Sequence, residues 1–162
     1  FWQPYLNGER APFYSPDARA GFFGISPHTT RAELQRAVFE GLAFAIVDAL
    51  QGYPQGGELY LTGGGAASAT WLQIIADCTG RTVVSSAFNE LSARGAAILA
   101  ARSVAALAET PPLAQTRYQP RPQAHARYAA LYPVYRLLRE QMLPVWQARQ
   151  AALQPLSQDV QP

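Results

Sequence analysis

The sequence predicts an α/β layered domain, and three observations carry that prediction. Short apolar runs that suit buried strands alternate along the chain with longer segments of helical periodicity. The strand-like run Glu58 to Thr62 leads through Gly63, Gly64 and Gly65 directly into one of these helical segments. The chain has 162 residues, of which 49% are hydrophobic and 15% charged, so it can bury the core of one compact domain.

The chain opens with an irregular segment. Residues 1–19 contain three prolines and the Asn7-Gly8 pair, which favour turns over regular structure. The aromatic run Gly21 to Ile25 is bounded by glycines and is expected to form a short strand. Because the sequence begins at Phe1 rather than at a methionine, and in a loop-like stretch, we interpret it as a piece of a longer protein.

The first predicted helix has a clear start. Thr30 and Glu33 match a capping box, which stabilises a helix by about 1 kcal/mol. Apolar residues then share one face over about twenty residues; they are Leu34, Ala37, Val38, Leu42, Ala45, Ile46, Ala49 and Leu50. Gly41 costs such a helix roughly 1 kcal/mol relative to alanine, so its presence predicts close packing against a neighbouring element.

The glycine run should form a tight turn, because glycine alone takes left-handed or strained dihedrals at little cost. A helix is expected from Ala66 to Gly80, on the spacing of Trp71, Ile74, Ile75 and Cys78. Backbone N–H groups and the positive end of the helix dipole favour an anion at such a turn, by roughly 0.3–1 kcal/mol at an exposed site. The run therefore indicates a site where bare backbone meets a ligand.

The second half of the chain predicts one more strand, Thr82 to Ser85, and a helix from Glu90 to Leu107. Gly95-Ala96-Ala97 within that helix is small enough for another element to approach closely. A proline-rich connection from Pro111 to Pro122 follows.

A C-terminal amphipathic helix is predicted beyond that connection, and its aromatic stripe should pack on the domain. The stripe consists of Tyr128, Leu131, Tyr132, Tyr135, Leu138, Met142 and Trp146. Pro133 and Pro144 should kink or shorten this helix. We expect a domain over residues 1–150 and a flexible tail over residues 151–162.

Composition excludes several classes of function. A net charge of +2 is too small to indicate nucleic-acid binding, and no apolar run is long enough for a membrane helix. All 13 basic residues are arginine, so the lysine of a Walker-type phosphate loop is missing. The single cysteine, Cys78, forms no internal disulfide and, with no visible signal peptide, favours a cytoplasmic location.

The glycine run leaves two other interpretations open. Gly63 to Ser68 comes close to the dinucleotide fingerprint G-x-G-x-x-G, but the segment Val84-Ser85-Ser86 lacks the acidic residue that would hold a ribose. A tight turn without any ligand also fits the pattern. The candidates for catalysis are weak, since Cys78 is expected to be a buried thiol and His28 and His125 to be loop or cap residues. The sequence predicts neither a metal cluster nor a general base.

Three ordered blocks resemble the C-terminal domain of the FGGY family of carbohydrate kinases. Residues 20–40, AGFFGISPHTTRAELQRAVFE, are similar to a family signature, and residues 61–77 to its nucleotide-binding segment. Arg94-Gly95-Ala96-Ala97 is similar to the Gly-Ala-Ala that opens the next helix of the family, and the tyrosines of the terminal helix match as well. The resemblance covers about 130 residues, with its closest details in the xylulokinase branch.

This resemblance implies the second lobe of a two-lobed kinase with a ribonuclease H-like, actin-type ATPase fold. It implies that ATP, with Mg²⁺ on its phosphates, lies against Gly63, Gly64, Gly65 and Ala66, and that Ser68 and Ala69 line the purine pocket. The sugar would be held through an upstream lobe, which would also carry the catalytic aspartate and the phosphate loop. A homodimer is compatible with this family.

The implied reaction is in-line transfer of the γ-phosphate to a sugar hydroxyl, with xylulose as the first expected substrate. The chain by itself is expected to be inactive, because none of its own residues is assigned a catalytic role. The alternative is a kinase-derived module that binds nucleotide, or regulates, without chemistry.

Overall fold

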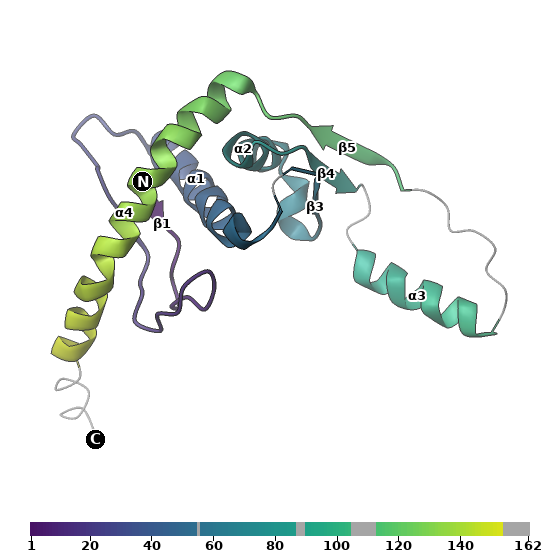
Figure 1. The fold of residues 1–162 in the computed structure, drawn as a ribbon, viewed down its shortest axis with the longest axis horizontal. Helices are drawn as coiled ribbons and strands as arrows, with labels where there is room; N and C mark the ends of the chain where they lie inside the picture. The colour runs from purple at the N-terminus through teal and green to yellow at the C-terminus, as the bar shows by residue number, and fades with distance from the viewer. Residues whose placement is uncertain (55, 87–89, 105–112, 154–162) are drawn as a thin grey trace.

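The computed structural model describes residues 1–54, 56–86, 90–104 and 113–153, and Figure 1 shows their arrangement. The strands are β1 (Trp2–Gln3), β2 (Gly21–Phe22), β3 (Leu59–Leu61), β4 (Val83–Ser86) and β5 (Gln115–Tyr118). The helices are α1 (Arg31–Ala49), α2 (Ala69–Thr79), α3 (Leu91–Val104) and α4 (Pro122–Leu153), with two short 3₁₀ turns, η1 (Leu50–Gly52) and η2 (Gly64–Ala67).

The described strands form two small sheets. In the first, β1 pairs antiparallel with β2, so that Trp2 lies opposite Phe22. The second has the order β3-β4-β5, in which β3 is parallel to β4 and β5 is antiparallel to it. Parallel neighbours need a crossover connection, and α2 supplies it between β3 and β4. The predicted alternation of strands and helices is therefore confirmed, although β1 and β5 fall in segments that we expected to be irregular.

The first helix matches its prediction. The Thr30 hydroxyl accepts a hydrogen bond from the Glu33 amide at 3.2 Å, and the Glu33 carboxylate accepts one from the Thr30 amide at 2.8 Å. Gly41 is buried, and a Cβ placed on it would lie 2.2 Å from the Trp2 carbonyl oxygen. The predicted close neighbour of this glycine is therefore β1.

The second helix begins later than predicted. The 3₁₀ turn η2 occupies residues 64–67, and Ser68 then caps α2, which starts at Ala69 rather than Ala66. Its end is as expected, because Gly80 takes a left-handed conformation with φ of 68°. Glycine is also required there because a Cβ would lie 2.6 Å from Cε1 of His125.

The last helix runs further than predicted. Pro133 and Pro144 lie inside the 32-residue α4, so neither proline shortens it. His125 belongs to its first turns and not to the preceding loop, and its Nδ1 lies 2.9 Å from the Asp77 carbonyl oxygen. The aromatic stripe packs as expected, since Tyr128, Tyr135 and Trp146 are buried.

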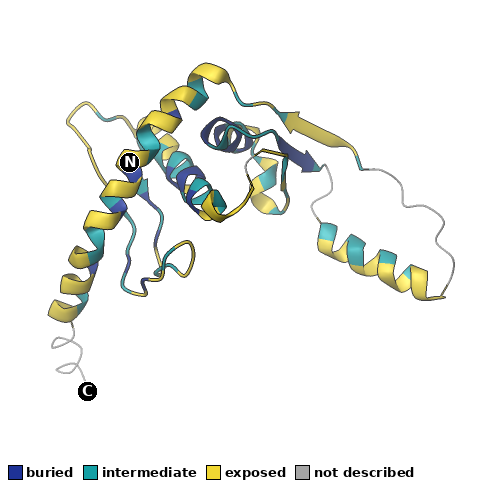
Figure 2. Ribbon diagram, in the orientation of Figure 1, coloured by how far each residue is buried: buried dark blue, intermediate teal, exposed yellow. Residues whose placement is uncertain are grey.

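Two hydrophobic clusters hold these elements together. The larger one joins α1, α2, β4 and the first half of α4; its buried members are Ala43, Phe44, Leu72, Ile74, Ile75, Ala76, Cys78, Val83, Tyr128 and Tyr135. The smaller one joins the irregular opening segment to the second half of α4 through Tyr5, Ala18 and Trp146. Figure 2 shows the buried surface concentrated on α1, α2 and β4.

Two buried carboxylates anchor α4 and the segment before it. Asp77 accepts hydrogen bonds from the Arg121 backbone amide at 2.8 Å and from Arg121 Nε at 3.0 Å. Asp48 pairs with Arg139, whose guanidinium also lies over the Phe13 ring at 4.9 Å from its centroid. Such pairs cost desolvation free energy but fix the position of the helices that carry them.

Helix α3 does not pack as the sequence suggested. Its described residues include none that is buried, and a Cβ on Gly95 would meet nothing within 4 Å. Figures 1 and 2 show α3 apart from the three-stranded sheet and largely exposed. The expected close approach at Gly95-Ala96-Ala97 is therefore wrong for the described part of the chain.

Among the helices that the structure describes, none is long and apolar enough to cross a membrane.

Candidate functional site: the glycine turn between β3 and α2

The candidate site is the turn that joins the end of β3 to the start of α2. Gly63 takes φ of 84°, which reverses the chain, and the Gly63 carbonyl then accepts a hydrogen bond from the Ala66 amide at 3.0 Å. Ser68 continues the turn by donating its amide to the Gly65 carbonyl at 3.2 Å. The Ser85 hydroxyl of β4 lies 3.4 Å from the Ala66 carbonyl oxygen, which joins the turn to the sheet. The predicted binding residues are therefore brought together in one ordered turn.

The three glycines have different surroundings, and two of them cannot carry a side chain without strain. Gly63 needs its positive φ, which side chains disfavour. Gly64 has no positive φ, and a Cβ on it would face open space. A Cβ on Gly65 would lie 2.2 Å from Cζ3 of Trp71, so the space left by its missing side chain is filled by the protein itself. The ring of Trp71, and not open space, therefore lies where the side chain of residue 65 would be.

The turn presents free backbone donors. Among the described residues, none accepts a hydrogen bond from the amide of Gly64 or of Gly65, and both glycines are exposed. The amide of Trp71 is satisfied by the Ser68 hydroxyl at 3.3 Å, in the usual manner of an N-cap. Exposed amides beside the N-terminus of an 11-residue helix form a suitable environment for a phosphate.

Ser68 and Ala69 have different positions in this arrangement. The Ser68 side chain caps α2, because its hydroxyl oxygen accepts a hydrogen bond from the Trp71 backbone amide. Ala69 begins the helix and is exposed, so its methyl group is available to a ligand next to the turn.

Trp71 is the residue of this site that sequence reasoning missed. Its ring lies against Gly65, and its Nε1 is buried without a hydrogen-bond partner among the described residues. The signal in the sequence was the position of Trp71, three residues after the N-cap Ser68. We assigned Trp71 only to the apolar face of the helix. The structure shows that this ring also supports the turn from within the chain.

The structure also places Cys78 and His28, which the sequence analysis considered. Cys78 is buried, and burial raises the pKa of its thiol far above the ordinary value, as expected for a structural cysteine. His28 lies in an exposed turn, where its amide lies 3.3 Å from the Ser26 hydroxyl. Across the described ranges, no three histidine, cysteine, aspartate or glutamate side chains gather to hold a metal ion.

Comparison with known proteins defines the family of this chain. Residues 1–104 match the model of the FGGY family of carbohydrate kinases, C-terminal domain. The chain is 35% identical over 153 residues to a xylulose kinase of Escherichia coli. This alignment covers 88% of this chain and 31% of that protein. It is also 35% identical over 157 residues to an erythritol kinase of Brucella abortus, covering 90% of this chain and 30% of the relative.

Solved structures agree with this match. A ligand-bound xylulose kinase from Lactobacillus acidophilus superimposes with a TM-score of 0.74 at 27% identity, over 87% of this chain and 31% of that structure. A Plasmodium falciparum glycerol kinase solved with ADP shares the fold, with a TM-score of 0.62 at 24% identity, over 82% of this chain and 29% of that structure.

The chain belongs to the FGGY family of carbohydrate kinases and contains its C-terminal domain. Its mixed α/β fold is that of the actin-like ATPase lobe of these kinases, ending in a long helix. It spans about 30% of the length of the curated relatives that it matches.

Proposed function

We propose that this chain is the nucleotide-binding lobe of an ATP-dependent carbohydrate kinase. The observation that carries the proposal is the glycine turn, which exposes the amides of Gly64 and Gly65 beside the N-terminus of α2. Such donors need no particular side chain and favour the negative charge of a phosphate. Membership of a carbohydrate kinase family supports the same interpretation.

In this proposal Gly63, Gly64, Gly65 and Ala66 hold the phosphate side of ATP, and Ala69 lies beside the purine. The lobe contributes positioning and charge stabilisation, which are the main protein contributions to phosphoryl transfer. Mg²⁺ bound with the nucleotide would neutralise charge on the phosphates. In the proposed kinase, the upstream lobe holds the sugar whose hydroxyl receives the γ-phosphate and carries the base that takes the proton of that hydroxyl.

We propose xylulose as the substrate to test first, because several of the most similar relatives are xylulose kinases. An erythritol kinase and a glycerol kinase match as well, so the test must include several polyols. The proposal includes a cytoplasmic location, where ATP is available.

Thermal unfolding in the presence of Mg·ADP tests nucleotide binding directly. At 100 times Kd, a ligand that binds only the folded state stabilises it by about 2.7 kcal/mol, which raises the melting temperature. Gly64→Val should abolish this increase, because the side chain would occupy the open space over the exposed amides. Gly52→Val is the matched control, since Gly52 is an exposed turn glycine whose Cβ would also meet nothing within 4 Å.

Phosphorylation assays with xylulose, ribulose, erythritol, gluconate and glycerol test the catalytic part. The 162-residue chain is expected to release no ADP with any of them, whereas a protein that joins it to an upstream lobe should prefer xylulose. Turnover by the chain alone would refute the assignment of catalysis to the upstream lobe. A melting temperature unaffected by millimolar Mg·ADP in that joined protein would refute nucleotide binding at the turn.

A further inference from the structure

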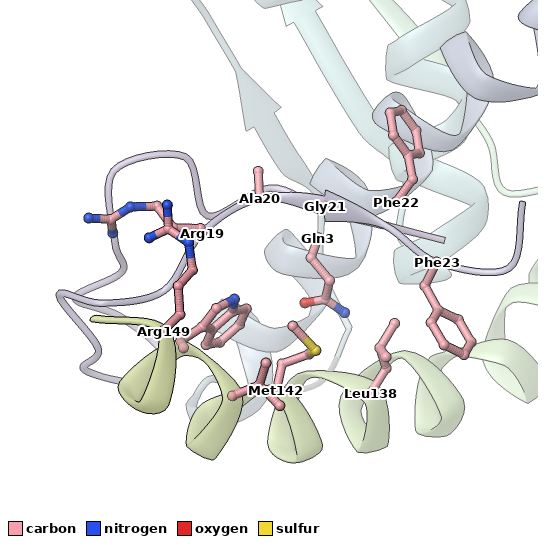
Figure 3. Close-up of a pocket in the computed structure, with 11 residues that line it drawn as sticks. Gln3, Arg19, Ala20, Gly21, Phe22, Phe23, Leu138, Met142 and Arg149 are labelled. Carbon is pink, nitrogen blue, oxygen red and sulfur yellow. The ribbon is translucent and has the colours of Figure 1, made fainter. Parts of the chain in front are cut away.

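A groove lies between β2 and α4, away from the glycine turn. Its volume is about 230 Å³, and its walls include Phe23, which directly follows β2, and Leu138, Met142 and Arg149 from α4. Gln3 reaches into it from β1, and Arg19 lines it from the segment before β2. We call this site the β2–α4 groove, and Figure 3 shows the residues that line it.

The groove contains a buried acceptor without a donor. Gln3 is only 3% exposed, and its Nε2 donates to the Tyr135 carbonyl oxygen at 3.4 Å. This hydrogen bond fixes the orientation of the amide and leaves Oε1 buried with no partner among the described residues. A buried acceptor without a hydrogen-bond donor destabilises the folded protein. A ligand that brings a hydroxyl or amino group to this oxygen would remove that destabilisation.

The two ends of the groove have different chemistry. Figure 3 shows Arg19 and Arg149 at one end, and Phe23 and Leu138 at the other, with Gln3 between them. Arg19 uses one guanidinium nitrogen to donate to the carbonyls of Pro16 and Ala18. In the described part of the chain, nothing accepts a hydrogen bond from the Arg149 guanidinium. Arginine donors are arranged in a planar fork that suits a carboxylate.

The apolar end is open to solvent. The side chain of Phe23 is 57% exposed, and Val145 of the same groove is 52% exposed. Apolar lining with a few convergent polar groups is typical of small-molecule sites. Along the groove, the arginine side chains come first, then the Gln3 oxygen and then the apolar surface. A ligand that fits should carry a negative charge, a hydrogen-bond donor and an apolar body in the same order.

We propose that the β2–α4 groove binds a small carboxylate that has an apolar body and a hydrogen-bond donor next to the carboxyl group. The carboxylate pairs with Arg149 and Arg19, the donor reaches Gln3 Oε1, and the apolar body lies against Phe23, Leu138 and Met142. The site is independent of the proposed nucleotide turn, because none of its residues belongs to β3, η2 or α2.

A probe of this chemistry is 3-phenyllactate, which has an aromatic ring, a hydroxyl and a carboxylate. Met142 is the only methionine of the sequence, so a ¹³C-methyl methionine label gives one NMR signal inside the groove. We expect titration with 3-phenyllactate to shift this signal saturably. 3-Phenylpropionate, which lacks the hydroxyl, should bind about tenfold more weakly, since a lost hydrogen bond of about 1.4 kcal/mol is tenfold in Kd.

Two matched variants test the charged end. Arg149→Gln should weaken 3-phenyllactate about three- to fivefold, as expected for an exposed ion pair, and leave binding of 2-phenylethanol unchanged. Arg127→Gln removes the same charge from another exposed position of α4 outside the groove and should change neither affinity. Both substitutions lie on the exposed surface, so the fold should tolerate them.

Three outcomes would overturn the proposal. One is a Met142 signal that does not respond to millimolar 3-phenyllactate. Another is equal affinity for 3-phenyllactate and 3-phenylpropionate, which would mean that Gln3 Oε1 takes no part. The third is displacement of 3-phenyllactate by Mg·ADP through direct competition, which would place the probe at the glycine turn. A Met142 shift without any effect of Mg·ADP on melting would support the groove and refute only the proposed nucleotide site.

Discussion

The contact between Gly65 and Trp71 allows a sharp test of why the turn contains three glycines. In Gly65→Ala, the new methyl group would lie 2.2 Å from Cζ3 of Trp71 and 3.0 Å from its Cε3. One of the two groups must therefore move. Overpacking of this kind typically costs 1–3 kcal/mol, and we expect about 2 kcal/mol here because a rigid ring is involved.

Gly64→Ala is the matched control, since it adds the same methyl group one residue earlier, where no atom lies within 4 Å. Replacing a glycine whose φ is compatible with alanine stabilises a protein by about 0.4–1 kcal/mol, through the unfolded state. Urea unfolding of the two variants should therefore differ by about 2–3 kcal/mol, with Gly65→Ala the less stable.

A double-mutant cycle tests whether the Trp71 ring causes the lower stability of Gly65→Ala. Trp71→Leu removes the ring, so that adding Gly65→Ala to it should cost much less than adding Gly65→Ala to the unchanged protein. The coupling free energy should lie between about 0.5 and 3 kcal/mol, the range for residues in contact. If Gly65→Ala and Gly64→Ala have equal stability, or if the cycle shows no coupling, the ring does not occupy the space we assign to it.

Three other predictions concern the core. Gly41→Ala should lower the free energy of unfolding by about 1–3 kcal/mol, because its Cβ would lie 2.2 Å from the backbone oxygen of Trp2; an unchanged urea midpoint would contradict the close approach of β1. Burial raises the pKa of Asp77, but hydrogen bonds from Arg121 and other donors outweigh it and hold the pKa below its usual value. This stabilisation is fully present above the unfolded pKa of about 3.9 and is lost as the pH falls through the lower folded value, so Asp77→Asn should flatten the acid limb of a stability–pH profile. Cys78 should react with a thiol reagent such as Ellman's reagent only on unfolding, because burial raises the pKa of its thiol; rapid labelling of the native protein would show that it is accessible.

Local signals of the sequence predicted the helices well. The capping box at Thr30 and Glu33 and the left-handed glycine at Gly80 depend on neighbouring residues alone, and both are confirmed. Gly41 required one further step, since a glycine within a helix implies a close neighbour without naming it. The neighbour, Trp2, lies 39 residues earlier in the sequence, in a strand that gave no strand-like pattern because it is only two residues long.

The parts that failed depend on contacts between distant segments. The strand β5 consists of polar residues and is held by pairing with β4, so apolar periodicity could not reveal it. Pro133 and Pro144 remain inside α4 because buried aromatic residues on both sides of them keep the helix in place. At the glycine turn, the sequence predicted the exposed backbone but could not distinguish Gly64, which faces open space, from Gly65, which faces Trp71.

The contact of Tyr5 with Tyr135 has a consequence for synthesis of the protein. Their hydroxyl groups lie 3.1 Å apart, although 130 residues separate them along the chain. At about 5–20 residues per second, a ribosome needs roughly 7–26 s to add the second tyrosine after the first. During this interval Phe44 and its neighbours on α1 lack the aromatic cover that α4 later provides. The nascent chain should therefore carry an apolar surface that chaperones can recognise until α4 leaves the exit tunnel.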